Sequence, residues 1–249
     1  MTSSKMVMKS LVFTLLAISL TLTPMIWAQP LASHMGAGSA PCRAGQEVPA
    51  ATAITANVTC DNDFALYVGD CCVATTFVGN NSCDVENVCI RHGAAFTLPP
   101  TTGSSYIYIV AWSDASVAQG LLASFVGPHT TISTGDPRWQ VYATTQTFPS
   151  FSSPGKKKFT KFLNAQLDMA CSGNLWTTPA VGGTNASGNV VPGGSGTILE
   201  PINAAGADAN ANWIWFQSGK AACAGPDSPF APGCNHNEFL IFRFPASYL

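Results

Sequence analysis

The sequence predicts an all-β protein, built as an antiparallel β-sandwich with long loops and little helix. Short runs alternate between apolar and polar residues, which is the pattern of strands that bury one face. Several of these runs are rich in β-branched and aromatic residues, and turn-forming Gly, Pro, Asn and Asp separate them at short spacing. Many short strands with almost no helical periodicity are typical of two packed antiparallel sheets.

The most informative stretch is residues 54–70, which read ITANVTCDNDFALYVGD. Two alternating runs flank an Asp-Asn-Asp corner, so each run is predicted to be a strand with one face in the core. The predicted core faces are Ile54, Ala56, Val58 and Cys60 before the corner, and Phe64, Leu66 and Val68 beyond it.

The remaining strands follow in order along the chain, and Asn164–Ala170 is the single fair helical candidate. A Gly-, Ala- and Asn-rich stretch, 182–212, is predicted to be a long and poorly ordered connection. Only two strong strands come after residue 182, too few for a separate core, so one domain is expected. The further predicted strands are Cys71–Val78, Ala95–Leu98, Tyr106–Trp112, Gly120–Val126, Trp139–Thr144, Trp213–Phe216 and Phe239–Phe244.

The N-terminal residues 1–28 have the layout of a cleaved signal peptide: a basic start, an apolar run and a small residue, Ala28. Residues 29–50 are expected to form a flexible leader, and residues 51–249 the domain. The chain is therefore predicted to be secreted, extracellular or at the cell surface, without membrane insertion after cleavage.

Charged residues make up only 10% of the chain and the net charge is −2, which argues against nucleic acid as a partner. The single cationic run is Lys156-Lys157-Lys158, which we interpret as a solvated loop.

Nine cysteines lie behind the predicted signal peptide, and in that context disulfide bonds are expected. Short loops favour Cys83 with Cys89 and Cys223 with Cys234. The adjacent Cys71 and Cys72 would point to opposite faces and so have different partners. An odd count leaves at least one cysteine unpaired or intermolecular, which allows self-association.

The corner residues Asp61, Asn62 and Asp63 are the first candidate binding site. Their side-chain oxygens can gather around a hard cation or a sugar hydroxyl. They can equally turn the chain by bonding nearby backbone. Both readings stay open on the sequence alone.

Among the tryptophans, Trp176 lies in a Gly/Thr/Pro loop and is expected to be exposed, where it could stack on a sugar ring. The sequons at Asn57, Asn80 and Asn185 are candidate glycosylation sites if the pathway is eukaryotic. No spacing nominates a nucleophile with its base or a pair of catalytic carboxylates, so an enzyme is not expected.

Several segments, taken together in their order, resemble a known family. ITANVTCDNDFALYVGD resembles the I-T-A-D-N-x-x-x-L-Y-V-N-G segment of galactose-binding-like jelly-roll domains, which include non-catalytic carbohydrate-binding modules of α-L-rhamnosidases. The family's Asn-Gly hairpin appears here as Gly69-Asp70, and 80–89 resembles an insertion. The segments that resemble the later family pieces are 108–112, 120–125, 134–139, Trp176 and 211–215.

The resemblance implies a jelly-roll fold, and it implies that Asp61 and Asn62 bind a calcium ion that engages sugar hydroxyls. Loops, water or the sugar must supply further oxygens, because calcium takes six to eight ligands. The expected function is a secreted, lectin-like, non-catalytic module that binds an extracellular glycan. The alternative is a structural or adhesive protein of the extracellular matrix or cell surface, assembled through its sandwich and its cysteines.

Overall fold

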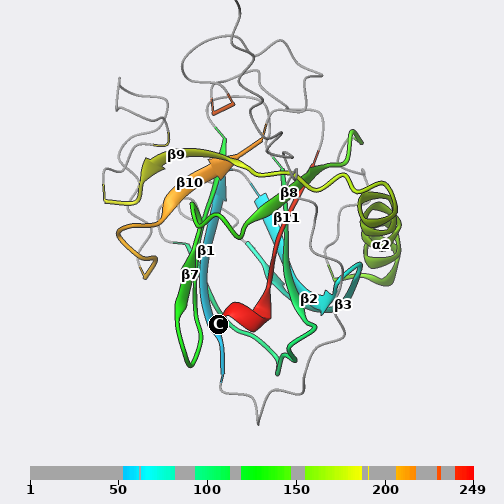
Figure 1. Ribbon diagram of the computed structural model, residues 1–249, viewed down its shortest axis with the longest axis horizontal. Helices are drawn as coiled ribbons and strands as arrows, with labels where there is room; N and C mark the ends of the chain where they lie inside the picture. The colour runs from blue at the N-terminus through cyan, green and yellow to red at the C-terminus, as the bar shows by residue number, and fades with distance from the viewer. Residues whose placement is uncertain are drawn as a thin grey trace, which may run out of the picture. The chain divides into compact units, whose positions relative to one another are not determined.

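The chain folds into two antiparallel sheets, which confirms the predicted all-β sandwich (Figure 1). The chain divides into two units, Met1–Gly36 and Ala37–Leu249, and every residue described below belongs to the second. The computed structural model describes residues 53–61, 63–81, 93–112, 119–146, 155–186, 190, 206–216, 229–230 and 239–249.

The first sheet has the strand order β4-β1-β6-β10-β9, and β7 pairs with β6 beside this path. Its strands are β1 (Thr55–Asp61), β4 (Ala94–Thr97), β6 (Gly120–Val126), β7 (Thr131–Ser133), β9 (Ala180–Thr184) and β10 (Asn212–Trp215).

The second sheet has the order β3-β2-β5-β11-β8. The apolar β5 lies at its centre between β2 and β11, as its β-branched and aromatic sequence predicts. Its strands are β2 (Asp63–Asp70), β3 (Val73–Asn80), β5 (Tyr106–Trp112), β8 (Gln140–Ala143) and β11 (Leu240–Pro245), and a 3-10 helix, η1 (Ala246–Tyr248), follows the last of them.

The two runs around the Asp-Asn-Asp corner belong to different sheets. β1 pairs with β4 and β6 in the first sheet, whereas β2 pairs with β3 and β5 in the second. Alternation placed the correct faces inward, because Val58, Cys60, Phe64 and Leu66 all lie in the core between the sheets. The corner is therefore the place where the chain passes from one layer of the sandwich to the other.

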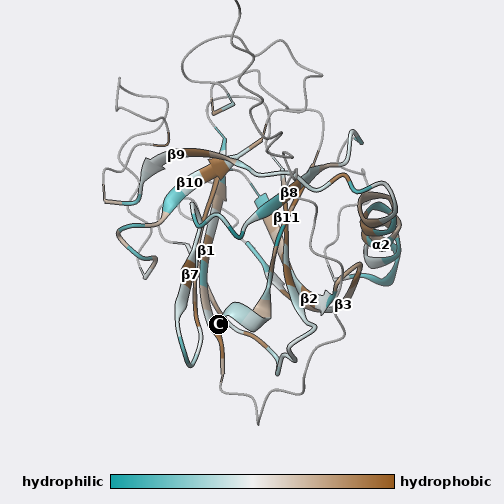
Figure 2. Ribbon diagram, viewed as in Figure 1, coloured by the Kyte–Doolittle hydropathy of each residue, from teal (hydrophilic) through white to brown (hydrophobic). Residues whose placement is uncertain are grey.

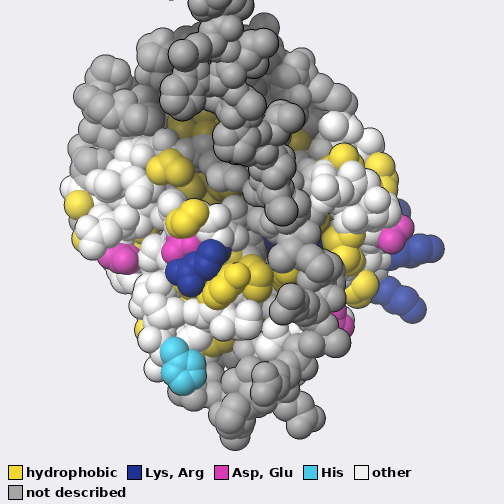
Figure 3. Space-filling model, viewed as in Figure 1, with side chains coloured by type: hydrophobic (Ala, Val, Ile, Leu, Met, Phe, Trp, Pro, Cys, Tyr) yellow, Lys and Arg dark blue, Asp and Glu magenta, His cyan; other side chains and the backbone are white. Residues whose placement is uncertain are grey.

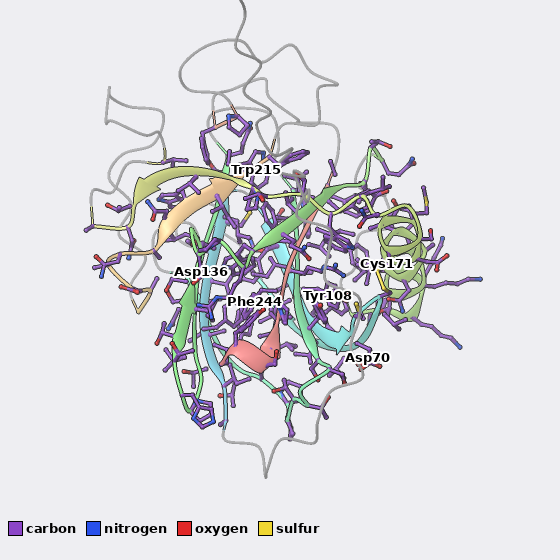
Figure 4. All side chains as sticks on the ribbon, viewed as in Figure 1. Asp70, Tyr108, Asp136, Cys171, Trp215 and Phe244 are labelled. Carbon is purple, nitrogen blue, oxygen red and sulfur yellow. A yellow bond between two sulfur atoms is a disulfide. The ribbon has the colours of Figure 1, made fainter. Side chains whose placement is uncertain are left out.

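Aromatic side chains fill much of the core between the sheets. Phe244 lies 4.7 Å from Trp139 and 5.1 Å from Phe125, measured between ring centroids. Trp213 and Trp215 of β10 are fully buried in the same cluster. Figure 4 labels Phe244 and Trp215 within this interior. Each such ring removes a large apolar surface from water, so these residues dominate the packing energy of the sandwich.

One helix, α2 (Lys157–Ser172), packs on the outer face of the second sheet (Figure 1). Its residues Phe159, Leu163, Leu167 and Ala170 recur at helical spacing and are buried against that sheet. Figure 2 shows the hydrophobic side of α2 toward the sheet and the hydrophilic side away from it. The predicted helix, Asn164–Ala170, was thus too short, and the interpretation of the lysine run as a loop was wrong.

Two strands, β7 and β9, were not predicted. β9 lies partly within the stretch that was expected to be a long connection. β9 occupies Ala180–Thr184 and pairs with β10, so residues 182–184 belong to the sheet rather than to a loop. An added Cβ at Gly182 would lie only 2.2 Å from the Val190 carbonyl oxygen, which explains glycine in this strand. Residues 187–189 and 191–205 of the predicted connection lie outside the described ranges.

A disulfide joins Cys72, in the turn between β2 and β3, to Cys171 near the end of α2, with the two Cα atoms 6.1 Å apart. Cys71 is also disulfide-bonded. The predicted pairs Cys83 with Cys89 and Cys223 with Cys234 lie outside the described residues. Within the described ranges, Cys60 is a free cysteine, and it is buried in the core. Over those same ranges, no helix has the length and apolar character needed to cross a membrane.

Candidate functional site

Two acidic residues lie on either side of the corner between the sheets. Asp61 ends β1 with only 4% of its surface exposed, and Asp63 begins β2 and is half-buried. Asn62, the third predicted site residue, lies outside the described residues. The passage from one sheet to the other therefore gathers acidic groups at one end of the sandwich.

Asp63 is held by donors from two neighbouring strands. Asn81, directly after β3, donates from Nδ2 to Asp63 Oδ1 over 2.8 Å, and Trp112 of β5 donates from Nε1 to Asp63 Oδ2 over 3.1 Å. The Asn81 Oδ1 atom accepts a 2.7 Å bond from the Phe64 backbone N–H. We name Asp61, Asp63, Asn81 and Trp112 the corner cluster.

Strand register explains why these residues meet. Asp63 lies directly opposite Trp112 in the β2–β5 ladder, and β3 runs back beside β2 so that it ends next to Asp63. From the sequence, neither Trp112 nor Asn81 was named as a site residue. The sequence places Trp112 at the end of a predicted strand and Asn81 shortly after the predicted strand Cys71–Val78, but only the strand pairing brings both residues to the corner.

The two acidic residues affect the pKa of a cysteine in the core. Burial raises the pKa of the Cys60 thiol well above its ordinary value, and the negative charges of Asp61 and Asp63 raise it further. A hydrogen bond involving the Trp112 backbone acts in the opposite direction, as a smaller contribution. The corner is therefore a negatively charged end of the sandwich, suited to cations and to hydrogen-bond donors such as hydroxyl groups.

The described residues do not by themselves fit a calcium site. Both oxygens of Asp63 already accept hydrogen bonds, and the side-chain oxygen of Asn81 is engaged by backbone. Over the described part of the chain, no group of three or more His, Cys, Asp or Glu side chains is arranged to hold a metal ion. Calcium takes six to eight oxygens, so a site here would need ligands beyond the described residues, and calcium binding at Asp61 and Asn62 stays a prediction.

Trp176 does not join the corner, and its predicted exposure was wrong. Its side chain is buried at 8% exposure on the outer face of the second sheet. Its ring lies 3.7 Å from the guanidinium carbon of Arg243 and packs edge-on against Tyr142, with 6.0 Å between the ring centroids. Trp176 thus packs within the layer between the sheet and α2.

Arg243 is a buried cation that sequence analysis missed. It is 2% exposed on β11, where it donates to Gln140 Oε1 over 2.9 Å and to the Cys71 carbonyl oxygen over 2.7 Å. Burial lowers its pKa, while the neighbouring Tyr108 and Tyr106 act in the opposite direction. Figure 4 labels Tyr108 and Cys171 in this region beside α2. The sequence feature that could have indicated a buried cation was an arginine inside the apolar run LIFRFP.

The three sequon asparagines lie in different surroundings. Asn57 and Asn80 are half-buried, and Asn80 donates from Nδ2 to the Asn81 carbonyl oxygen. Asn185 is 1% exposed and its Nδ2 donates to the carbonyl oxygens of Ala207 and Asp208. N-glycosylation links the sugar to this Nδ2 atom, so Asn185 is poorly accessible for glycosylation in the folded chain.

No family model, curated protein or solved structure matches the chain. The likeness to galactose-binding-like domains therefore stays a prediction that rests on the segments quoted from the sequence. The two-sheet sandwich itself stands on the strand pairing.

Proposed function

We propose that the chain is an exported, non-catalytic module that binds glycans at the corner cluster. One observation carries this proposal: the Asp63 carboxylate of β2, the Trp112 indole of β5 and the Asn81 amide after β3 are hydrogen-bonded together at the corner of the sandwich. Glycan sites combine these groups, because sugars present hydroxyls for polar contacts and apolar ring faces for aromatic ones.

Trp112 is the aromatic group that this proposal uses, in place of Trp176. The residue is half-buried, and its Nε1–H is fixed by Asp63. A ring held in one orientation loses little conformational freedom when a ligand binds. Carboxylate and amide groups such as those of Asp63 and Asn81 are the polar side chains that can exchange hydrogen bonds with sugar hydroxyls.

Calcium assistance, with Asp61 and Asn62 as ligands, is a separate part of the proposal that the family resemblance implies. The described geometry does not require it, so glycan binding and calcium dependence are tested as two questions. A glycan array answers both when it is probed with and without a chelator.

The array compares the wild-type chain with Trp112→Ala and with Tyr248→Ala, a matched control because Tyr248 is an aromatic residue exposed at 45% elsewhere. We expect the wild type to bind a defined set of glycans, Trp112→Ala to lose at least tenfold in affinity, and Tyr248→Ala to stay within twofold. Tm values of all three proteins check folding. No glycan bound by the wild type, or equal binding by folded Trp112→Ala, would refute the proposal. Loss of signal in chelator would support calcium.

A structural or adhesive role is the second candidate, and exposed apolar side chains favour it. Met169 and Leu175 flank Cys171, and Val73 follows its disulfide partner, with exposures of 51%, 48% and 45%. Exposed apolar groups near one another mark contact surfaces. Concentration-dependent sedimentation that Met169→Ser/Leu175→Ser abolishes would support self-association, and a monomer at all concentrations would exclude it.

A further inference from the structure

We propose that the start of α2 is a docking surface for a sulfated polysaccharide, independent of the corner cluster. Four lysines lie within six residues at this point of the fold, and all four are exposed: Lys156, Lys157, Lys158 and Lys161. We name them the lysine patch. Figure 3 shows dark blue side chains projecting at the edge of the molecule where Figure 1 places α2.

The patch concentrates the positive charge of a chain that is otherwise poor in it. The other described cations are Arg138, which pairs with Asp136, and the buried Arg243. The whole chain has a net charge of −2, so the patch is a local feature rather than the result of a basic composition. A compact group of like charges attracts a partner of opposite charge and steers its approach.

The lysines stand on a rigid support. The backbone N–H of Gly155, just before the helix, donates to the Tyr67 hydroxyl over 3.0 Å, and an added Cβ at Gly155 would collide with the Phe77 ring. Asn164 then joins α2 to β3 by bonds of 2.8 and 3.1 Å with the Ala74 backbone. One side of the helix is thereby fixed to the sheet, so the lysines are held on the other.

The electrostatics of the free helix are unfavourable at this end. The first turn contains no acidic residue, and the N-cap residue Lys156 makes no side-chain capping bond. Cations at a helix N-terminus oppose the helix dipole, and the like-charged Lys157 and Lys161 are four residues apart, on the same face. A bound polyanion would offset both the unfavourable dipole interaction and the repulsion between the lysines. Ligand binding would therefore explain why this helix end carries lysines that destabilise it in the free protein.

The shape of the patch favours a chain-like polyanion over an anionic membrane. The helical lysines, Lys157 to Lys161, span about 6 Å along the axis at about 1.5 Å per residue. The exposed Asp168 lies two turns beyond Lys161, and the exposed apolar Met169 comes after it. A flat anionic surface would meet Asp168, and apolar groups able to enter lipid are absent from the first turn. A linear chain of sulfate groups can contact the lysines alone.

The test measures heparin binding by calorimetry at several salt concentrations, with neutral dextran and phosphatidylserine vesicles as comparison ligands. A variant with all four lysines changed to Gln is compared with the four Lys→Arg changes, which keep the charge, and with Arg138→Gln, which removes a cation elsewhere. We expect the Gln variant to lose at least tenfold in heparin affinity, and the other two to stay within threefold of the wild type.

Thermal unfolding gives a second readout that also checks folding. Heparin should raise the Tm of the wild type and leave the Tm of the Gln variant unchanged, whereas without heparin the Gln variant should melt at the same or a higher temperature. Wild-type binding to heparin that survives in the Gln variant would overturn the proposal. So would the absence of heparin binding, or tighter binding to the vesicles than to heparin. Glycan binding at the corner cluster is unaffected by these changes, so the two proposals fail separately.

Discussion

At the scale of single residues, Arg243 shows how a charge can be buried on the outer face of a β-sandwich. Its guanidinium group donates to Gln140 and Cys71 and stacks on the Trp176 ring. A lysine ammonium has neither the planar face nor the forked donors for these contacts. We therefore expect Arg243→Lys to lower the free energy of unfolding by about 2–3 kcal/mol.

Urea denaturation measures this change, and Arg138→Lys is the matched control. Arg138 is 34% exposed and pairs with Asp136, so its replacement should cost less than about 1 kcal/mol. If both variants lost the same free energy of unfolding, the contacts of the buried Arg243 would contribute no more than those of the exposed Arg138, which would contradict this prediction.

Asp136 contributes a pH-dependent increment of stability. The hydrogen bond from Arg138 is the main cause that lowers the pKa of Asp136 below its ordinary value of 3.8. A lowered pKa means that the stabilisation is present above the unfolded pKa and is lost as the pH falls through the folded value. We expect Asp136→Asn to cost less than about 1 kcal/mol at pH 7, with the difference from wild type vanishing at low pH. Denaturation curves that diverge as the pH falls would contradict this sign.

Cys60 is expected to be unreactive in the folded protein. Its thiol is buried and its pKa is raised by desolvation and by the two corner carboxylates, so little thiolate forms at pH 8. Mass spectrometry after iodoacetamide treatment should find Cys60 unmodified in the native protein and modified in denaturant. Rapid native labelling at Cys60 would show that the core opens or that the thiol lies elsewhere.

At the scale of elements, the disulfide between Cys72 and Cys171 fixes α2 to the turn between β2 and β3. It closes a loop with a sequence separation of 99 residues, for which chain entropy predicts a stabilisation of about 4–5 kcal/mol. We expect Cys72→Ala/Cys171→Ala to lower the free energy of unfolding by this order in urea. Cys60→Ala controls for the loss of a buried cysteine without a bridge. A loss no larger than that of the control would refute a stabilising role for the bridge.

The sequence predicted elements well where the local pattern decides the structure. β5 and β6 have the predicted bounds, Tyr106–Trp112 and Gly120–Val126, because β5 is β-branched, aromatic or apolar throughout and β6 is mostly apolar. α2 was too short in the prediction because the lysine run hides the periodicity that Phe159 and Leu163 begin. β9, with the sequence AVGGT, has too much glycine to be recognised as a strand without its partner β10.

At the scale of the whole molecule, the sequence predicts which face of a strand is buried but not which strands pair with each other. Alternation predicted which residues of β1 and β2 face the core, yet nothing local states that the two strands belong to different sheets. The same limit applies to the site: Asp61 and Asp63 lie on either side of Asn62 in the sequence and were predicted, whereas Asn81 and Trp112 reach Asp63 only through strand register. Pairing between distant segments depends on the complete core, so it cannot be read from one strand.

The most direct test of glycan recognition at the corner cluster is the two-dimensional 15N–1H spectrum of the tryptophan indoles during a glycan titration. The sequence has six tryptophans, and Trp112→Phe assigns the resonance that matters. The account predicts that the Trp112 Nε1–H signal shifts on saturation with an array-selected glycan, while those of the buried Trp213 and Trp215 do not. Binding that leaves the Trp112 signal in place would contradict it.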